Sequence, residues 1–142
     1  MKKIIVSLCF AIFLLSLNGC NNTKVSNDLN IEIGKSTKFS QSEINDAIDC
    51  VKDNFDFKAC TLTKLWYEEK QSNSLVDAYL NYGRGSVNDV KNEDVIVILS
   101  NFVVDDSGDN PVFNSNSSYT NYSWTLIRKG KNSKWEIDDC GY

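Results

Sequence analysis

The first amphipathic segment of the chain begins at residue 40. Ser40 and Glu43 have the spacing of a capping box, in which each side chain bonds to the backbone of the other residue. The apolar residues that follow recur every three or four positions, which is the period of one helix face: Ile44, Ala47, Ile48, Val51 and Phe55. The pattern therefore predicts an amphipathic helix that packs on an apolar surface.

A second helical pattern lies between residues 72 and 81. Ser72 or Ser74 is a suitable N-cap, and Gly83 is a suitable stop just beyond the helix. The apolar stripe of this segment consists of Leu75, Val76, Tyr79 and Leu80. We expect a helix that runs through Asn81.

Four segments have β-branched and aromatic residues in short runs, which is typical of strands: 60–68, 94–104, 119–128 and 134–138. Residues 95–99 are apolar throughout, which predicts a strand covered on both faces. A polar turn at 129–133 joins the last two strands as a hairpin. Alternation in the first strand predicts one face made of Thr61, Thr63, Leu65 and Tyr67 and another made of Leu62, Lys64 and Trp66.

The order of these elements predicts an α+β fold, in which two helices pack on a curved antiparallel sheet of about four strands. We expect a single domain over residues 39–142. Residues 20–38 are rich in Asn, Ser, Lys and Thr, which predicts a flexible tether. Within that segment, Ile31 and Ile33 alternate with charged or small residues and indicate a short strand only weakly.

The N-terminal segment has the layout of a secretory signal. Lys2 and Lys3 precede an apolar run over residues 4–17, which is shorter than the roughly 20 residues that a membrane span needs. The run ends in Leu17-Asn18-Gly19-Cys20, and a cysteine directly after a small residue is the pattern of a lipobox. The alternatives are an uncleaved membrane anchor and an ordinary signal with a chance cysteine.

In this segment the chain resembles a bacterial lipoprotein precursor. The resemblance implies cleavage between Gly19 and Cys20 and a diacylglycerol thioether on the Cys20 sulfur. Two acyl chains hold a protein stably on a membrane. We therefore expect residues 1–19 to be a signal peptide and the mature protein to be lipid-anchored at the extracytoplasmic face of the cell membrane.

The net charge of the chain limits the classes of partner that it is expected to bind. The formal net charge is −4, and removal of Lys2 and Lys3 with the signal takes away two positive charges to give −6. Nucleic acids and anionic lipid surfaces are both bound by basic faces. We therefore expect no nucleic-acid partner, and we attribute membrane attachment to the lipid on Cys20.

Three further cysteines follow Cys20, namely Cys50, Cys60 and Cys140. Export favours disulfide formation, and three thiols allow one internal bridge. We favour Cys50–Cys60, because a helix end, a turn and a returning strand would bring these two face to face. Cys50–Cys140, Cys60–Cys140 and three free buried thiols are the alternatives. The chain has no histidine, so we expect no metal site and no cofactor.

The absence of histidine also removes the common acid–base and nucleophile–base pairs, so we do not expect an enzyme. The alternative is a histidine-free hydrolase or isomerase with a carboxylate in a cavity of the sheet. If the helices cover the sheet only partly, a ligand pocket lined by Tyr82, Asn101 and Trp124 results. A filled core is the other interpretation.

Four blocks of sequence carry a family resemblance: CTLTKLWY at 60–67, DVIVILSNF at 94–102, WTLIR at 124–128 and WEIDDCGY at 135–142. Over about residues 39–142 the chain resembles a family of small lipoproteins of unknown function from Gram-positive bacteria. That family is similar in fold to the nuclear transport factor 2-like, or cystatin-like, superfamily. The resemblance implies helices on one face of a curved antiparallel sheet and supplies no catalytic residues.

These observations predict a membrane-anchored, non-catalytic domain that binds an envelope protein, a peptide or a small ligand. The remaining alternative is a scaffolding lipoprotein without a pocket, which forms a homodimer through the outer face of its sheet.

Overall fold

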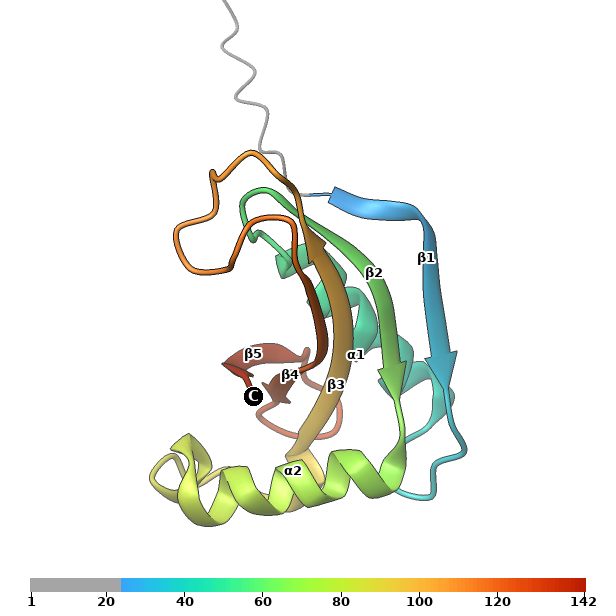
Figure 1. Cartoon of the computed structure of the whole chain (residues 1–142). Helices are drawn as coiled ribbons and strands as arrows, with labels where there is room; N and C mark the ends of the chain where they lie inside the picture. Colours follow the sequence, from blue (N-terminus) through green and yellow to red (C-terminus); the bar gives the residue numbers. More distant parts are fainter. Residues whose placement is uncertain (1–23) are drawn as a thin grey trace, which may run out of the picture.

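Five strands form one open sheet in the order β1-β2-β3-β4-β5 in a computed structural model that describes residues 24–142 (Figure 1). The strands are β1 (Lys24–Ile33), β2 (Cys60–Tyr67), β3 (Val95–Val104), β4 (Ser118–Ile127) and β5 (Glu136–Gly141). The helices are α1 (Gln41–Asn54) and α2 (Glu69–Tyr82), with 3₁₀ turns η1 (Arg84–Ser86) and η2 (Asn92–Asp94). The α+β class and the two helices are confirmed.

The sheet includes a fifth strand, β1, in a segment where the sequence indicated a short strand only weakly. β1 lies at the edge and pairs in parallel with β2, so the sheet is mixed and has five strands rather than about four antiparallel ones. Residues 24–33 therefore belong to the sheet and not to a tether. An edge strand exposes much of its surface, and a polar segment can form one; an ion pair of 2.8 Å joins Glu32 to Lys64 of β2.

A bulge in β2 changes which of its side chains face the core. The pairing register with β3 shifts between Leu62 and Lys64, so strict alternation is interrupted at Thr63. As a result the buried residues of β2 are Cys60, Leu62, Leu65 and Tyr67. Leu65 and Tyr67 share a face as predicted, but the prediction that Leu62 lies on the other face is wrong, because the bulge turns Leu62 to the same side.

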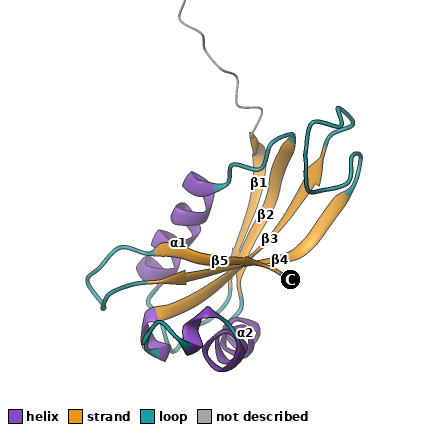
Figure 2. Cartoon of the chain, turned by 90° about the vertical axis from the view of Figure 1, so that its left-hand side faces the viewer, coloured by secondary structure: helices purple, strands orange, loops and turns teal. Residues whose placement is uncertain are grey.

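The main core lies between α1 and one face of the sheet, as Figure 2 shows from the side. α1 begins as predicted, with a capping box between Ser40 and Glu43. Its buried residues are Ile44, Ala47, Ile48 and Val51, which match the predicted apolar stripe. These pack against the side chains of β3 and β4 that share one face: Ile96, Ile98, Phe102, Tyr122, Trp124 and Leu126.

α2 packs on the opposite face, across the end of the sheet where β3 begins. Its buried side chains Val76 and Tyr79 form a smaller cluster with Val95 and Val97 of β3. Because Val95 and Val97 alternate with Ile96 and Ile98 of the main core, β3 is covered on both faces at this end, as predicted.

The start of α2 differs from the expected cap at Ser72 or Ser74. The helix begins at Glu69, and the side chain of Glu68 accepts hydrogen bonds from the backbone N–H groups of Lys70 and Gln71. Ser72 is buried instead, and its Oγ accepts a hydrogen bond of 3.0 Å from the Val97 backbone N–H. A serine that binds a strand and a serine that caps a helix look alike in sequence.

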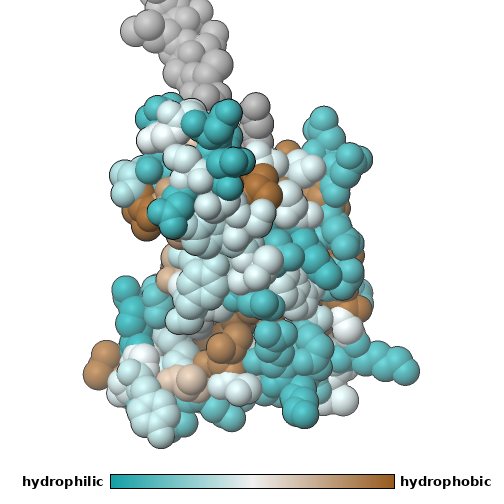
Figure 3. Space-filling view, viewed as in Figure 1, coloured by the Kyte–Doolittle hydropathy of each residue, from teal (hydrophilic) through white to brown (hydrophobic). Residues whose placement is uncertain are grey.

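Figure 3 shows the face of the sheet that α1 leaves uncovered. Hydrophobic surface on this side is broken into separate patches by hydrophilic side chains and by side chains of intermediate hydropathy. Within residues 24–142, neither helix has the length and apolarity that crossing a membrane requires.

Candidate functional site

A cleft of about 550 Å³ separates α1 from the hairpin that joins β4 to β5. Its volume falls in the range of about 300–1,000 Å³ that small-ligand sites occupy. From α1 and its end it is lined by Glu43, Asp46, Asp49, Cys50, Asp53 and Asn54. From the hairpin it is lined by Arg128, Lys131, Asn132, Ser133, Lys134 and Trp135.

One wall of the cleft is acidic because of helical spacing. Residues three and four positions apart lie on the same side of a helix, which aligns Glu43, Asp46, Asp49 and Asp53. Asp49 forms an ion pair with Lys52 at 3.0 Å. Among the residues that the structure describes, Asp46 and Asp53 form no ion pair.

The opposite wall is basic. Lys131 and Lys134 are exposed on the hairpin, and within residues 24–142 neither forms an ion pair. Apart from one ion pair, between Arg128 and Glu43, the two walls face one another across the cleft without an ion pair among the described residues. Their charges remain available to a third group placed between them.

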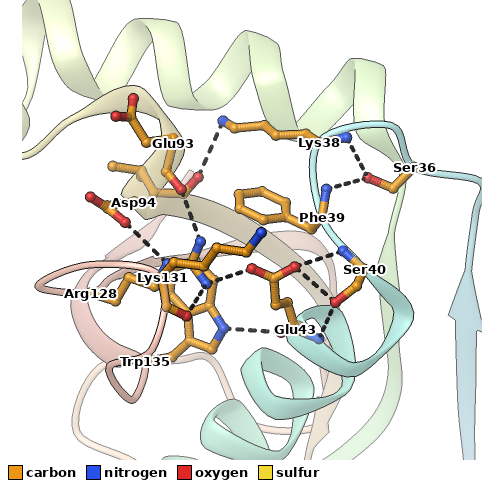
Figure 4. A network of polar contacts seen from close by, with 11 residues as sticks. Ser36, Lys38, Phe39, Ser40, Glu43, Glu93, Asp94, Arg128, Lys131 and Trp135 are labelled. Atoms are coloured by element: carbon orange, nitrogen blue, oxygen red, sulfur yellow. Dashed lines mark hydrogen bonds and ion pairs between the residues drawn. The ribbon is translucent and has the colours of Figure 1, made fainter.

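Arg128 holds the inner end of the cleft together (Figure 4). Its Nη1 donates to Glu43 Oε1 at 2.8 Å, and its Nε donates to Asp94 Oδ1 at 3.1 Å. Further donations go to the backbone carbonyls of Lys131 and Glu93, both at 3.3 Å. Each nitrogen of the guanidinium group therefore has a partner within the fold, so Arg128 positions the walls and does not itself offer a binding group.

Two aromatic rings enclose the Arg128 guanidinium. Its central carbon lies 5.7 Å from the centre of the Phe39 ring and 4.5 Å from the Trp135 ring. The Trp135 indole N–H donates to the Glu43 carbonyl at 3.0 Å, which ties the hairpin to the first turn of α1. Rings placed this way attract a cation and shield it from water.

Glu43 links the helix cap to this network. Its Oε2 accepts hydrogen bonds of 2.8 Å from both the backbone N–H and the hydroxyl of Ser40. The bond from the Ser40 backbone, followed by that from Arg128, lowers the pKa of Glu43 from 4.5 to about 2. Glu69 behaves similarly: bonds from Ser36, the Lys38 backbone and Thr37 lower its pKa to about 2.

We expect the protein to lose stability as the pH falls from about 4.5 to about 2. The folded state binds protons on Glu43 and Glu69 more weakly than the unfolded chain does, so their contribution is complete above pH 4.5 and is lost as they become protonated. Urea unfolding between pH 6 and pH 2 measures this loss. The double variant Glu43→Gln with Glu69→Gln is expected to flatten the acid limb, and an unchanged limb would contradict the assignment.

A second polar cluster lies on the α2 side of the sheet. The Tyr79 hydroxyl donates to Asp138 Oδ2 at 2.7 Å and accepts from Asn88 at 2.8 Å, while Arg84 pairs with Asp138 at 3.2 Å. Burial, followed by the bond to Asp138, raises the pKa of Tyr79 to about 12. The cluster ties the end of α2 to β5, so we assign it a structural role.

Replacing Gly85 by alanine is expected to destabilise the fold by about 1–3 kcal/mol, because overpacking forces neighbouring groups to shift. A Cβ atom at Gly85 would lie 2.5 Å from Cε1 and 2.7 Å from Cδ1 of the Tyr79 ring. The ring must move, which disturbs its bond to Asp138. Urea unfolding measures the effect, with Val87→Ala at an exposed neighbouring position as the control; equal stability of the two variants would contradict the prediction.

The predicted Cys50–Cys60 disulfide is absent, and Cys140 forms none with either; all three described cysteines are free. Cys50 lies in the cleft and its Sγ donates to the Trp135 carbonyl at 3.4 Å. The Cys60 sulfur instead contacts the Lys58 carbonyl and the Asn110 side-chain amide. The two thiols therefore point into different parts of the molecule. Burial is the main cause that raises the pKa of each.

The expected pocket of Tyr82, Asn101 and Trp124 does not form. Trp124 is only 2% exposed and donates from its indole N–H to Ser100 Oγ at 2.8 Å within the main core. Tyr82 is 90% exposed at the end of α2, which packs on the other face of the sheet. Asn101 accepts a hydrogen bond from the Asn121 backbone. Aromatic side chains fill the space in which we expected a cavity.

Gly19 and Cys20, the predicted cleavage and lipidation residues, lie outside the described residues. Within residues 24–142 no group of three or more histidine, cysteine, aspartate or glutamate side chains is arranged to hold a metal ion.

Comparison with known protein families finds one family that matches most of the domain. A profile described as a domain of unknown function, DUF4829, matches residues 47–141, about two thirds of the chain. The chain belongs to the DUF4829 family. The DUF4829 match extends from the middle of α1 to the end of β5, so it includes Arg128, Trp135 and most of the cleft. No curated protein and no solved structure matches the chain significantly.

The cleft was not predicted from the sequence, although one of its walls follows from helical spacing. The polar side of α1, with Asp46, Asp49 and Asp53, is visible from helical spacing alone. Helical spacing does not show that the hairpin lies over that side, because the position of the hairpin depends on the residues with which Arg128 pairs. One signal for the cleft was available in the sequence. Arg128 directly follows an apolar strand, and a charged side chain buried there needs partners from other elements.

Proposed function

We propose that the mature chain is a lipid-anchored binding domain at the extracytoplasmic face of the cell membrane. The lipobox Leu17-Asn18-Gly19-Cys20 supports the anchor. The cleft supports the binding role, and it is the observation on which this proposal rests. Its position differs from the pocket that we expected, because it lies between α1 and the hairpin and not between the helices and the sheet.

The chemistry of the cleft favours a ligand that carries both charges. Asp46 and Asp53 attract amines, and Lys131 and Lys134 across the cleft attract carboxylates. A carboxylate or lysine without an ion pair contributes more free energy to binding a charged ligand than a group that is already paired within the protein. We therefore propose a short peptide segment with amine and carboxylate groups as the ligand class, and a non-catalytic role.

Binding of a mixed-charge peptide tests this role. An alternating Lys–Glu hexapeptide would be titrated into residues 20–142 in soluble form, with binding followed by backbone amide NMR shifts. Two variant pairs remove one wall each: Asp46→Asn with Asp53→Asn, and Lys131→Gln with Lys134→Gln. Each pair is expected to weaken binding about tenfold, which corresponds to about 1.4 kcal/mol.

The control is Asp28→Asn with Lys91→Gln, which removes exposed charges outside the cleft. It is expected to bind as the parent does. Shifts that map away from α1 and the hairpin, or equal losses in all three variants, would show that the cleft is not the binding site.

Metabolic labelling with a palmitate analogue tests the anchor. The label is expected on the wild-type protein and absent from a Cys20→Ser variant. Label on neither protein would contradict the lipoprotein assignment. Label on both proteins would show that the acyl group is attached to a residue other than Cys20.

A scaffolding role without a ligand is the second candidate. It is favoured by the ten-residue edge strand β1, whose outer edge has no paired strand among the described elements. Exposed strand edges pair with other chains. Size-exclusion chromatography with light scattering measures the mass of residues 20–142, and a dimer that Val25→Lys dissociates would favour this candidate.

We also propose a relation in fold to the nuclear transport factor 2-like superfamily. The antiparallel succession β2 to β5, with α1 packed on one face, supports it. The parallel strand β1 is an addition to the arrangement that we expected.

A further inference from the structure

One end of the sheet gathers the start of β1 and two connecting segments. Lys24 pairs with Thr61 at the start of β2, and Cys60 pairs with Val104 at the end of β3. The segments that emerge here are residues 55–59, between α1 and β2, and residues 105–117, between β3 and β4. We call these two segments the loop end; Figure 1 places them beside the start of β1 and far from α2.

The loop end is built as part of the body of the domain. The Asn110 side chain donates to the Lys58 carbonyl at 2.6 Å and accepts from the backbone N–H groups of Val112 and Phe113. Phe113 packs against Phe57 with ring centres 5.1 Å apart. These contacts fix the position of the loop relative to the sheet. The loop end and the sheet therefore share one orientation relative to the membrane.

Covalent geometry limits how far this end can lie from Cys20. Four residue steps connect Cys20 to Lys24, and a fully extended chain covers at most about 3.6 Å per residue, which gives a maximum of about 14 Å. β3 has ten residues at about 3.3 Å each, so its two ends are about 30 Å apart. α2 packs at the distant end, on Val95 and Val97.

We propose that the loop end is the surface that faces the lipid bilayer, and that α2 points away from it. The proposal rests on acylation of Cys20, which belongs to the function proposed above. A linker shorter than half the length of the sheet keeps the loop end close to the headgroups. The expected tether of residues 20–38 would have let the domain turn freely, but the pairing of β1 with β2 begins at Lys24.

The charge of the loop end makes the acyl chains the source of affinity. Asp106 and Asp109 are exposed there, and Lys58 is the nearby cation, 3.9 Å from Asp109. Such a surface is not attracted to anionic lipid, and the two acyl chains alone hold it in place. The large apolar side chain of Val112 is also exposed there, at 78%.

This orientation places the inner end of the cleft away from the membrane. Arg128 closes that end and bonds to Asp94, which directly precedes β3 at the end of the sheet near α2. The opposite end of the cleft is lined by Asp53 and Asn54, which directly precede residues 55–59 of the loop end, so this orientation places that end of the cleft toward the bilayer.

Quenching by a labelled lipid tests the orientation. Val112→Cys and Tyr82→Cys, each combined with Cys140→Ser, place a thiol at exposed positions at the two ends of the domain. The full precursor would be produced in cells, purified from the membrane fraction, checked for acyl groups by mass, labelled with bimane and reconstituted into phosphatidylcholine vesicles that contain a nitroxide headgroup lipid. Protein with Cys140→Ser alone gives the background from Cys50 and Cys60.

The nitroxide is expected to quench bimane at position 112 about threefold or more above position 82. Insertion of about twenty Gly and Ser residues between Thr23 and Lys24 gives a linker span of about 25 Å and is expected to remove the difference. Equal quenching at both positions in acylated protein, or stronger quenching at position 82, would overturn the orientation and leave the anchor intact. Purified protein without acyl groups would overturn the anchor and the orientation together.

Discussion

Replacing Arg128 by methionine is expected to lower the free energy of unfolding by about 3–5 kcal/mol, because removal of one partner leaves buried charges uncompensated. Only 5% of the Arg128 side chain is exposed, and its guanidinium pairs with Glu43 and Asp94. Methionine fills a similar volume between Phe39 and Trp135, so the loss reflects the charge network. Urea unfolding at pH 7 measures it.

Lys129→Met is the matched control, since it removes a neighbouring positive charge that is exposed. It is expected to change stability by less than about 0.5 kcal/mol. Arg128→Lys is expected to recover only part of the stability, because an ammonium group cannot reproduce the fork that reaches Glu43 and Asp94 together. Equal stabilities of the methionine and control variants would show that the network contributes little.

Replacing Trp124 by alanine is expected to cost about 3–5 kcal/mol, the usual loss for a large aromatic side chain in a core. The Trp124 ring stacks on Phe57 at 5.3 Å between ring centres and contacts Phe55 and Tyr122. The substitution also removes the indole N–H that donates a hydrogen bond to Ser100 Oγ. Thermal and urea unfolding both measure the change.

The same experiment distinguishes a filled core from the pocket that we first expected. Tyr82→Ala removes an aromatic side chain that is exposed at the far end of α2, and it is expected to be close to neutral. If Trp124 and Tyr82 lined one cavity, their losses would be similar and each alanine would enlarge a ligand site. A large loss at Trp124 with none at Tyr82 supports the packing described here.

Local signals in the sequence were sufficient where a few neighbouring residues decide the structure. The capping box of Ser40 and Glu43 depends only on residues three positions apart, and it is present. The apolar run of β3 required cover on both faces, and α1 and α2 provide it. In both cases the energetic preference is local or is contained in one continuous run.

The features that the sequence did not predict depend on distant partners. β1 is mostly polar, and its strand conformation follows from parallel pairing with β2, in which each residue pairs with one at least 34 positions further along the chain. The bulge after Leu62 follows from pairing with β3. Ser72 does not cap α2, because its hydroxyl accepts a hydrogen bond from the distant Val97 backbone, and Glu68 caps the helix instead.

The candidate site was not predicted, for the same reason. Helical spacing gives the acidic side of α1, but only the ion pairs of Arg128 bring the β4–β5 hairpin across from it. The predicted disulfide failed because the turn after α1 places Cys60 beside Asn110, whereas Cys50 faces Trp135. Cysteine spacing alone contains no information on these orientations.

The covalent structure of the N-terminus decides whether the mature protein is anchored by lipid on Cys20. Protein extracted from the membrane fraction would be digested, and its first peptide would be sequenced by tandem mass spectrometry. We expect this peptide to begin at Cys20 and to carry a diacylglyceryl group on the cysteine sulfur. A peptide that begins at Met1, or an unmodified Cys20 in the mature protein, would contradict it.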